Sequence, residues 1–212
     1  MNRLVFLSLF LLGCGRTLAI AESPSEEPST RAVSDVSPEL DAAAEAPDAK
    51  ASEVLASSVQ DFSGTQGQGG WFYGFVSPDV SPEFTPFPSF KDGRWSQGAS
   101  GWLELTAAGG SPETGGVESW AVRRWASSVR GSVTVTLRFF KTEISCGNGM
   151  TADVVQGGAV RWSKWIAFND AVGVTESVRL ELEEGEPVDF RLLPHEGQDS
   201  CDHAHFSAVV KR

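Results

Sequence analysis

Tryptophan and the polar residues around it are the side chains of this sequence best suited to bind a ligand. Residues 61–212 contain eleven of the thirteen phenylalanines and all seven tryptophans, at positions 71, 95, 102, 120, 125, 162 and 165. Sugars present apolar C–H faces that stack on flat rings, while their hydroxyl groups bond to Arg, Asp, Asn or Gln beside the ring. This composition favours carbohydrate recognition.

One segment combines a tryptophan with polar neighbours on the same face of an expected strand. In residues 159–168, two-residue alternation places Arg161, Ser163 and Trp165 together, opposite a more apolar face. A face that mixes an indole with a guanidinium suits sugar binding better than a uniformly apolar one. Trp165 and Arg161 are therefore the first candidate ligand-binding residues.

Four other aromatic positions complete the set of candidates or define their strand. Trp71, Tyr73 and Phe75 share one face of a strand expected at 71–76, and Trp71 and Tyr73 are further ligand-binding candidates. Seven tryptophans exceed what one small core needs, so we expect Trp95 and Trp165 to be exposed. The alternative for any single tryptophan is packing in the core, which is the more frequent fate of large aromatic side chains.

The sequence contains no pattern typical of a catalytic centre. It has no Gly-x-Ser-x-Gly, phosphate-binding loop, HExxH or catalytic-triad pattern, so neither an enzyme activity nor a cofactor is predicted. A run of carboxylates at Glu181, Glu183, Glu184 and Glu186 lies on an expected strand and turn. Glycosidases need two carboxyl groups across a cleft, one of them with a raised pKa, so a solvated face is the better interpretation of this run.

The first residues predict export. Arg3 precedes an apolar run, Leu4–Leu12, that is too short to span a bilayer and is typical of a signal peptide. Leu11-Leu12-Gly13-Cys14 resembles the lipobox of bacterial lipoproteins, which predicts a signal peptide at 1–13 and a lipid on Cys14, anchoring the chain to the cell envelope, at the outer membrane. The alternative is cleavage after Ala21, with a signal peptide at 1–21 and a secreted protein.

Residues 14–60 are predicted to form a disordered, acidic tether. The stretch 22–60 is built mainly from Ala, Ser, Glu, Pro and Asp, has no aromatic residue and contains nine acidic residues against Arg31 and Lys50. Such a segment buries too little apolar surface to offset its ordering entropy. An alanine-rich helical stalk at 39–56 is the alternative.

Residues 61–212 show strand periodicity throughout and no amphipathic helix. Apolar and polar residues alternate in short runs between Gly, Pro, Asn and Asp turns. The expected strands are 71–76, 101–106, 120–125, 132–139, 159–168, 178–183, a strand starting at Pro187, and 206–211. This pattern predicts an all-β, antiparallel two-sheet β-sandwich of the jelly-roll type. Its 19 acidic and 13 basic residues argue against a nucleic-acid partner.

Two cysteines remain for this domain if Cys14 belongs to the leader. Cys146 and Cys201 both lie in loop-like sequence, and an exported protein folds in an oxidising setting, so we predict a disulfide between them. The alternatives are two free thiols or a metal pair, although no CxxC or Cys-His spacing supports zinc.

No metal ligand is assigned, but one cation site remains open. His203 and His205 supply two potential ligands without a third at a fixed spacing, which does not make a transition-metal site. Asp199 and Asp202 offer hard oxygen ligands in a loop, so a structural calcium ion is an alternative there.

Several segments resemble a β-sandwich module of exported bacterial proteins that often accompanies polysaccharide-processing enzymes. The resemblance rests on Asp61–Phe75, Ala121–Trp125, Gly131–Val135, Gly185–Phe190 and Asp202–Phe206. It implies a non-catalytic, carbohydrate-binding-like jelly roll. Where the module would have an acidic Gly-Asp-Gly turn, this chain has Gly147-Asn148-Gly149, which weakens a cation site there.

Two functions therefore follow from the sequence. The first is a surface-anchored β-sandwich that binds a polysaccharide or glycan through exposed aromatic residues. The second is a structural or adhesive envelope protein that binds another protein. A row of exposed aromatic rings beside polar groups would indicate the first, and one large apolar patch would indicate the second.

Overall fold

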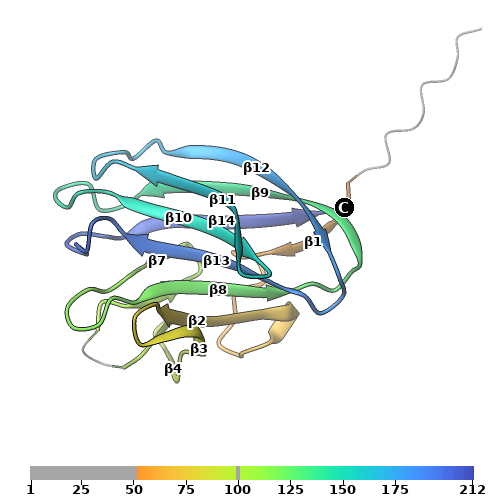
Figure 1. Ribbon diagram of the computed structural model, residues 1–212, viewed down its shortest axis with the longest axis horizontal. Coiled ribbons are helices and arrows are strands. Elements are labelled where there is room, and N and C mark those ends of the chain that lie inside the picture. The colour runs from red at the N-terminus through yellow and green to blue at the C-terminus, as the bar shows by residue number, and fades with distance from the viewer. Residues whose placement is uncertain (1–51, 99–100) are drawn as a thin grey trace, which may run out of the picture. The chain divides into compact units, whose positions relative to one another are not determined.

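Two antiparallel β-sheets pack against each other and enclose a single apolar core (Figure 1). The computed structural model describes residues 52–98 and 101–212. In those residues the only helix is a short 3₁₀ turn at Gln68–Gly70. The predicted all-β, two-sheet sandwich is confirmed.

The eight-stranded sheet follows the order β12-β9-β14-β7-β6-β5-β4, and β1 adds to it by pairing with β14. Its strands are β1 (Val54–Ser57), β4 (Ser89–Lys91), β5 (Arg94–Ser96), β6 (Glu104–Thr106), β7 (Gly109–Ser111), β9 (Gly131–Lys141), β12 (Val174–Leu182) and β14 (Ala204–Lys211).

The six-stranded sheet follows the order β11-β10-β13-β8-β2-β3. Its strands are β2 (Trp71–Ser77), β3 (Ser81–Pro86), β8 (Trp120–Ala126), β10 (Met150–Gln156), β11 (Ala159–Ile166) and β13 (Pro187–Pro194). From β8 onward most connections carry the chain from one sheet to the other, which is the wrapping typical of jelly rolls.

Alternation along the strands determines which side chains fill the core. Val133, Val135, Leu137 and Phe139 of β9 are buried, while the residues between them face outward or lie at the boundary. Across the core, Phe206 of β14 contacts aromatic rings of the six-stranded sheet, such as that of Phe190 at 6.4 Å between ring centroids. Every predicted strand overlaps an observed one.

The folded region begins earlier than the predicted boundary at residue 61. Val54–Ser57, assigned from composition to the tether, forms β1 and pairs with β14, and Ala56 is buried in the core. The strand contains a short apolar run, Val54-Leu55-Ala56, inside a polar, alanine-rich sequence, and the average composition of that sequence does not reveal the run. The predicted signal peptide, Cys14 and residues 14–51 of the predicted tether lie outside the described residues.

Candidate functional site

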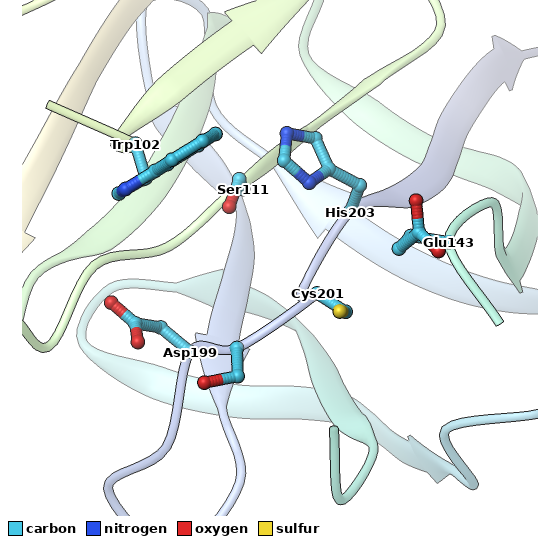
Figure 2. Close-up of a pocket in the computed structure, with 7 residues that line it drawn as sticks. Trp102, Ser111, Glu143, Asp199, Cys201 and His203 are labelled. Atoms are coloured by element: carbon cyan, nitrogen blue, oxygen red, sulfur yellow. The ribbon is translucent and has the colours of Figure 1, made fainter. Parts of the chain in front are cut away.

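A pocket of about 420 Å³ (Figure 2) lies at the end of the sandwich where β14 begins, and the C-terminus lies at the other end of this strand (Figure 1). Its walls come from loops and strand ends that are distant in sequence. They comprise Trp102 between β5 and β6, Ser111 at the end of β7, Glu143 after β9, and Asp199, Ser200, Cys201 and His203 before β14. This volume falls within the range of small-molecule sites.

Trp102 forms the aromatic wall of this pocket. It is 68% exposed, the most exposed tryptophan of the described residues. The His203 ring meets the indole edge-on, with an interplanar angle of 87° and 6.3 Å between ring centroids. In Figure 2 the Asp199 carboxylate lies on the Trp102 side of the pocket and Glu143 on the His203 side. A flat ring flanked by polar groups is therefore available to a ligand.

His203 is linked to the strand beside Trp102 through Glu104. Its Nε2 lies 3.7 Å from Glu104 Oε1, and the other carboxylate oxygen of Glu104 accepts a 2.8 Å hydrogen bond from Arg94. The His203 imidazole and then Arg94 hold the pKa of Glu104 below its ordinary value of 4.5, against the opposing effect of burial. The contacts of Glu104 with His203 and Arg94 position the His203 imidazole beside the Trp102 indole.

The Cys146–Cys201 disulfide joins the two loops that supply most of the pocket, so the predicted bridge is confirmed. It connects the loop after β9 to the loop before β14, with 5.6 Å between the two Cα atoms. The Asn148 side chain also donates a 2.6 Å hydrogen bond to the backbone carbonyl of His195. The loop that carries Asp199 and His203 is thus held at several points.

A buried ion pair lies beneath the pocket floor. Lys141 Nζ is 3.1 Å from Asp202 Oδ1, both side chains are fully buried, and the ammonium also donates to the Cys201 carbonyl oxygen. Burial lowers the pKa of Lys141 and raises the pKa of Asp202, while their mutual attraction opposes both shifts. Removing one partner of such a pair leaves an uncompensated buried charge.

The two carboxylates considered for calcium have other partners. Asp202 faces Lys141, and Asp199 Oδ2 accepts a 2.7 Å hydrogen bond from the backbone N–H of Thr114. In the described part of the chain, no group of three or more His, Cys, Asp or Glu residues is arranged to hold a metal ion. A calcium ion at this loop stays a prediction.

Three of the predicted ligand-binding residues lie in the core. Trp71 and Tyr73 are completely buried, and Trp95, expected to be exposed, is only 5% exposed. Tyr73 and Trp95 stack with 5.6 Å between centroids, and the Trp95 indole donates to the Ser63 carbonyl. The expectation failed because these rings point into the core. There Tyr73 and Trp95 meet the segment from Phe62 to Gln66, and Trp71 packs beside Phe190.

Trp165 is exposed as expected. It is 49% exposed on β11, with its indole 5.4 Å from the His195 ring. Arg161 is also exposed, but the β10–β11 register shifts at this point, so that Val160, Arg161 and Trp162 span only Val154 and Val155. This bulge interrupts the alternation that linked Arg161 to Trp165. The carboxylates at Glu181, Glu183 and Glu184 are solvated as predicted.

Sequence reasoning missed Trp102, the tryptophan that lines the pocket. The strand predicted at 101–106 included Trp102, whereas β6 begins only at Glu104. The sequence around Trp102 did indicate a loop. Gly98 and Gly101 precede it, and no apolar residue two positions before or after it continues an alternating pattern. Loop tryptophans that no strand pattern explains are candidates for exposure.

No family model matches the chain. No curated protein matches it either. Among solved structures, the CBM51-2 and INT domains of Clostridium perfringens ZmpB are similar over 76% of this chain and 30% of theirs, with 10% identity and a TM-score of 0.36. A Stig cyclase, Fisc, of Fischerella sp. TAU is similar over 72% of this chain and 89% of its own, with 11% identity and a TM-score of 0.34.

A β-glucosidase of Kluyveromyces marxianus in complex with glucose is similar over 70% of this chain and 16% of its own, with 12% identity and a TM-score of 0.33. This chain thus spans less than a third of the length of the ZmpB structure that contains the CBM51-2 and INT domains. These likenesses concern the fold and assign neither ligand nor activity to this chain. The described residues contain no helix with the length and hydropathy of a membrane span.

Proposed function

We propose that the β-sandwich is a non-catalytic module that binds carbohydrate in the Trp102 pocket. The observation that carries the proposal is the exposure of the Trp102 indole, 68%, at a pocket that also holds carboxylate, imidazole and hydroxyl groups. An indole left in water is unfavourable unless a partner covers it. A sugar ring supplies an apolar face for the indole and hydroxyl groups for the polar wall.

The negative charge of the pocket restricts the kinds of sugar that it can bind. Glu143 and Asp199 line it, Glu104 lies behind His203, and the whole chain carries a formal charge of −11. Acidic polysaccharides and nucleic acids would meet carboxylates on every side. Neutral or amine-bearing sugars are therefore the proposed ligands.

The groups around the pocket support binding without bond cleavage. The general acid of a glycosidase needs a raised pKa. Glu143 is fully exposed, and the hydrogen bond from the Ser145 hydroxyl instead holds its pKa below the ordinary value. Cys201 is in a disulfide, and the Ser111 hydroxyl donates 3.1 Å to the Pro112 carbonyl rather than to an imidazole. Neither Cys201 nor Ser111 is poised as a nucleophile, and Glu143 is not poised as a general acid.

The location of the protein is part of the proposal. A lipid on Cys14 would attach the chain to the cell envelope, at the outer membrane, and the acidic segment would act as a tether that lets the pocket reach glycans at a distance from the membrane. Cleavage after Ala21 would instead release the same module into the surroundings. Mass spectrometry of the mature N-terminus distinguishes the two.

A glycan array tests the binding proposal directly. The native chain should bind a defined set of neutral or amino sugars, and the heat-denatured chain should bind none. Trp102→Ala should lose the signal of the sugars that bind in the pocket, while Trp102→Phe keeps part of it. Unchanged binding by Trp102→Ala would overturn the assignment of the pocket. No signal from the native chain on any glycan would favour a protein partner, the adhesive alternative.

A further inference from the structure

A row of charged side chains crosses the outer face of the six-stranded sheet, away from the core. Asp153 of β10 lies opposite Arg191 of β13, and Asp189 of β13 lies opposite Arg124 of β8. Opposite residues of an antiparallel pair point to the same side of the sheet. Their inward-facing neighbours, such as Phe190, fill the core.

The charges of this row balance one another. Arg124 donates through Nε and one Nη to the two oxygens of Asp189, at 2.6 and 3.0 Å, and Arg191 donates to the same carboxylate at 2.9 Å. Asp153 supplies the second negative charge beside Arg191, so the two arginines face two carboxylates. A neutral ligand fits this surface, because an anion or a cation would upset the balance.

Two polar atoms in the row have no partner. Asp153 Oδ1, an acceptor, and Arg191 Nε, a donor, are buried without a hydrogen bond among the described residues. Asp153 is 9% exposed, and burial raises the pKa of its carboxyl group. A buried polar group without a partner is costly. A hydroxyl group of a ligand lying against the exposed part of the Arg191 side chain, 18% of its surface, has the donor and the acceptor that these two atoms lack.

Aromatic rings stand on both sides of the row. Phe84 of β3 lies under the Arg124 guanidinium, 4.3 Å from its ring centroid, and packs over Gly74, where a Cβ would come within 2.7 Å of the ring. At the other side, Trp165 of β11 pairs with Thr151, two residues from Asp153 on the same face. A depression of about 250 Å³ lies in this face, lined by Phe84, Arg124, Asp189 and Arg191 and by the Glu83 carboxylate, which adds negative charge at this side and disfavours an acidic chain.

We propose that this outer face is a second carbohydrate site, which takes a neutral polysaccharide chain lying across the strands. Trp165 offers a stacking plane at one side, the depression beside Phe84 receives the chain at the other, and Asp153 and Arg191 offer an acceptor and a donor between them. The site is built on strands, whereas the Trp102 pocket is built on loops at the end of the sandwich. Its existence does not depend on that pocket.

Affinity electrophoresis of the whole chain tests the second site. The protein is run through native gels containing laminarin, xyloglucan or galactomannan as neutral probes, and polygalacturonate as an acidic one. The variants are Trp165→Ala, Trp165→Phe and Asp153→Asn, with Trp102→Ala to report on the pocket. The matched control is Phe90→Ala, which removes a 39% exposed ring from β4 of the other sheet. Thermal melting of each variant verifies that the fold persists.

We expect a neutral probe to retard the wild type, and Trp165→Ala to bind it about tenfold more weakly. Asp153→Asn should also weaken retention, Trp165→Phe should preserve most of it, and Phe90→Ala should be retarded like the wild type. Retention that vanishes in Trp102→Ala but is unchanged in Trp165→Ala and Asp153→Asn would overturn the second site and leave the pocket standing. Preference for polygalacturonate, or no retention by any neutral probe, would also overturn it.

Discussion

The aromatic cluster inside the sandwich and the aromatic wall of the pocket use the same residue types for different ends. Tyr73 and Trp95 stack at 5.6 Å, and Phe62 meets Tyr73 edge-on at 4.9 Å. Among the described residues the one aromatic ring that Trp102 contacts is that of His203, edge-on, and Trp102 is 68% exposed, against 5% for Trp95. The difference arises from position: Trp95 lies on a strand, and Trp102 precedes one.

Burial and polar satisfaction go together in the inner cluster. The Gln66 side chain accepts a hydrogen bond from the N–H of Tyr73 and donates one to its carbonyl, each at 2.8 Å. It thus pairs with the β2 backbone as a residue of a neighbouring strand would. The segment from Phe62 to Gln66, part of the aromatic stretch Asp61–Phe75 on which the sequence resemblance rests, therefore serves packing. A distinctive motif with many aromatic residues need not be a binding motif.

The largest effect should come from truncating the inner cluster. Trp95→Ala removes a buried ring from Tyr73 and Phe90 and should lower the free energy of unfolding by about 4 kcal/mol. Chemical denaturation monitored by circular dichroism gives this value. A loss below about 1 kcal/mol would contradict the structural role of Trp95.

Removing the disulfide should come next. The double variant Cys146→Ala/Cys201→Ala frees two loops separated by 55 residues and should cost about 3 kcal/mol. Because both loops line the pocket, binding at Trp102 should weaken even at temperatures where the sandwich stays folded. Unaltered glycan affinity in the folded double variant would show that the pocket does not need the bridge.

A smaller effect concerns acid stability. The pKa of Glu104 is depressed in the folded protein, so its stabilisation is present above about pH 4.5 and is lost as the pH falls through the folded value. Glu104→Gln should therefore lose less melting temperature than the wild type between about pH 5 and pH 3. Equal slopes in the two proteins would refute a stabilising role for the His203–Glu104–Arg94 chain.

The fold could be predicted from the sequence because period-two alternation is a strong signal over long strands. β9, β12 and β14 were visible in this way. The short strands β4, β5 and β7 contain only three residues each, too few for a period to show. β1 was missed because its apolar step lies in a segment whose average composition is that of a disordered chain.

The site was predictable only in part. The Cys146–Cys201 bridge and the exposure of Trp165 followed from local sequence. Alternation separates the two faces of a strand, but it does not tell which face meets the other sheet, so Trp71 and Tyr73 were placed wrongly. The number of tryptophans does not tell which of them is exposed, so Trp95 was placed wrongly too. The pocket joins Trp102 to Glu143 and Asp199 across long sequence distances, and no local pattern encodes that meeting.

The paired measurement of glycan affinity and melting temperature in Trp102→Ala tests the central claim most directly. With the strongest ligand from the array, titration calorimetry should show at least about tenfold weaker binding, while the free energy of unfolding changes by less than about 0.5 kcal/mol. Unchanged affinity, or weakened binding that accompanies a large loss of stability, would contradict the account of Trp102 as a solvent-facing platform for a sugar ring.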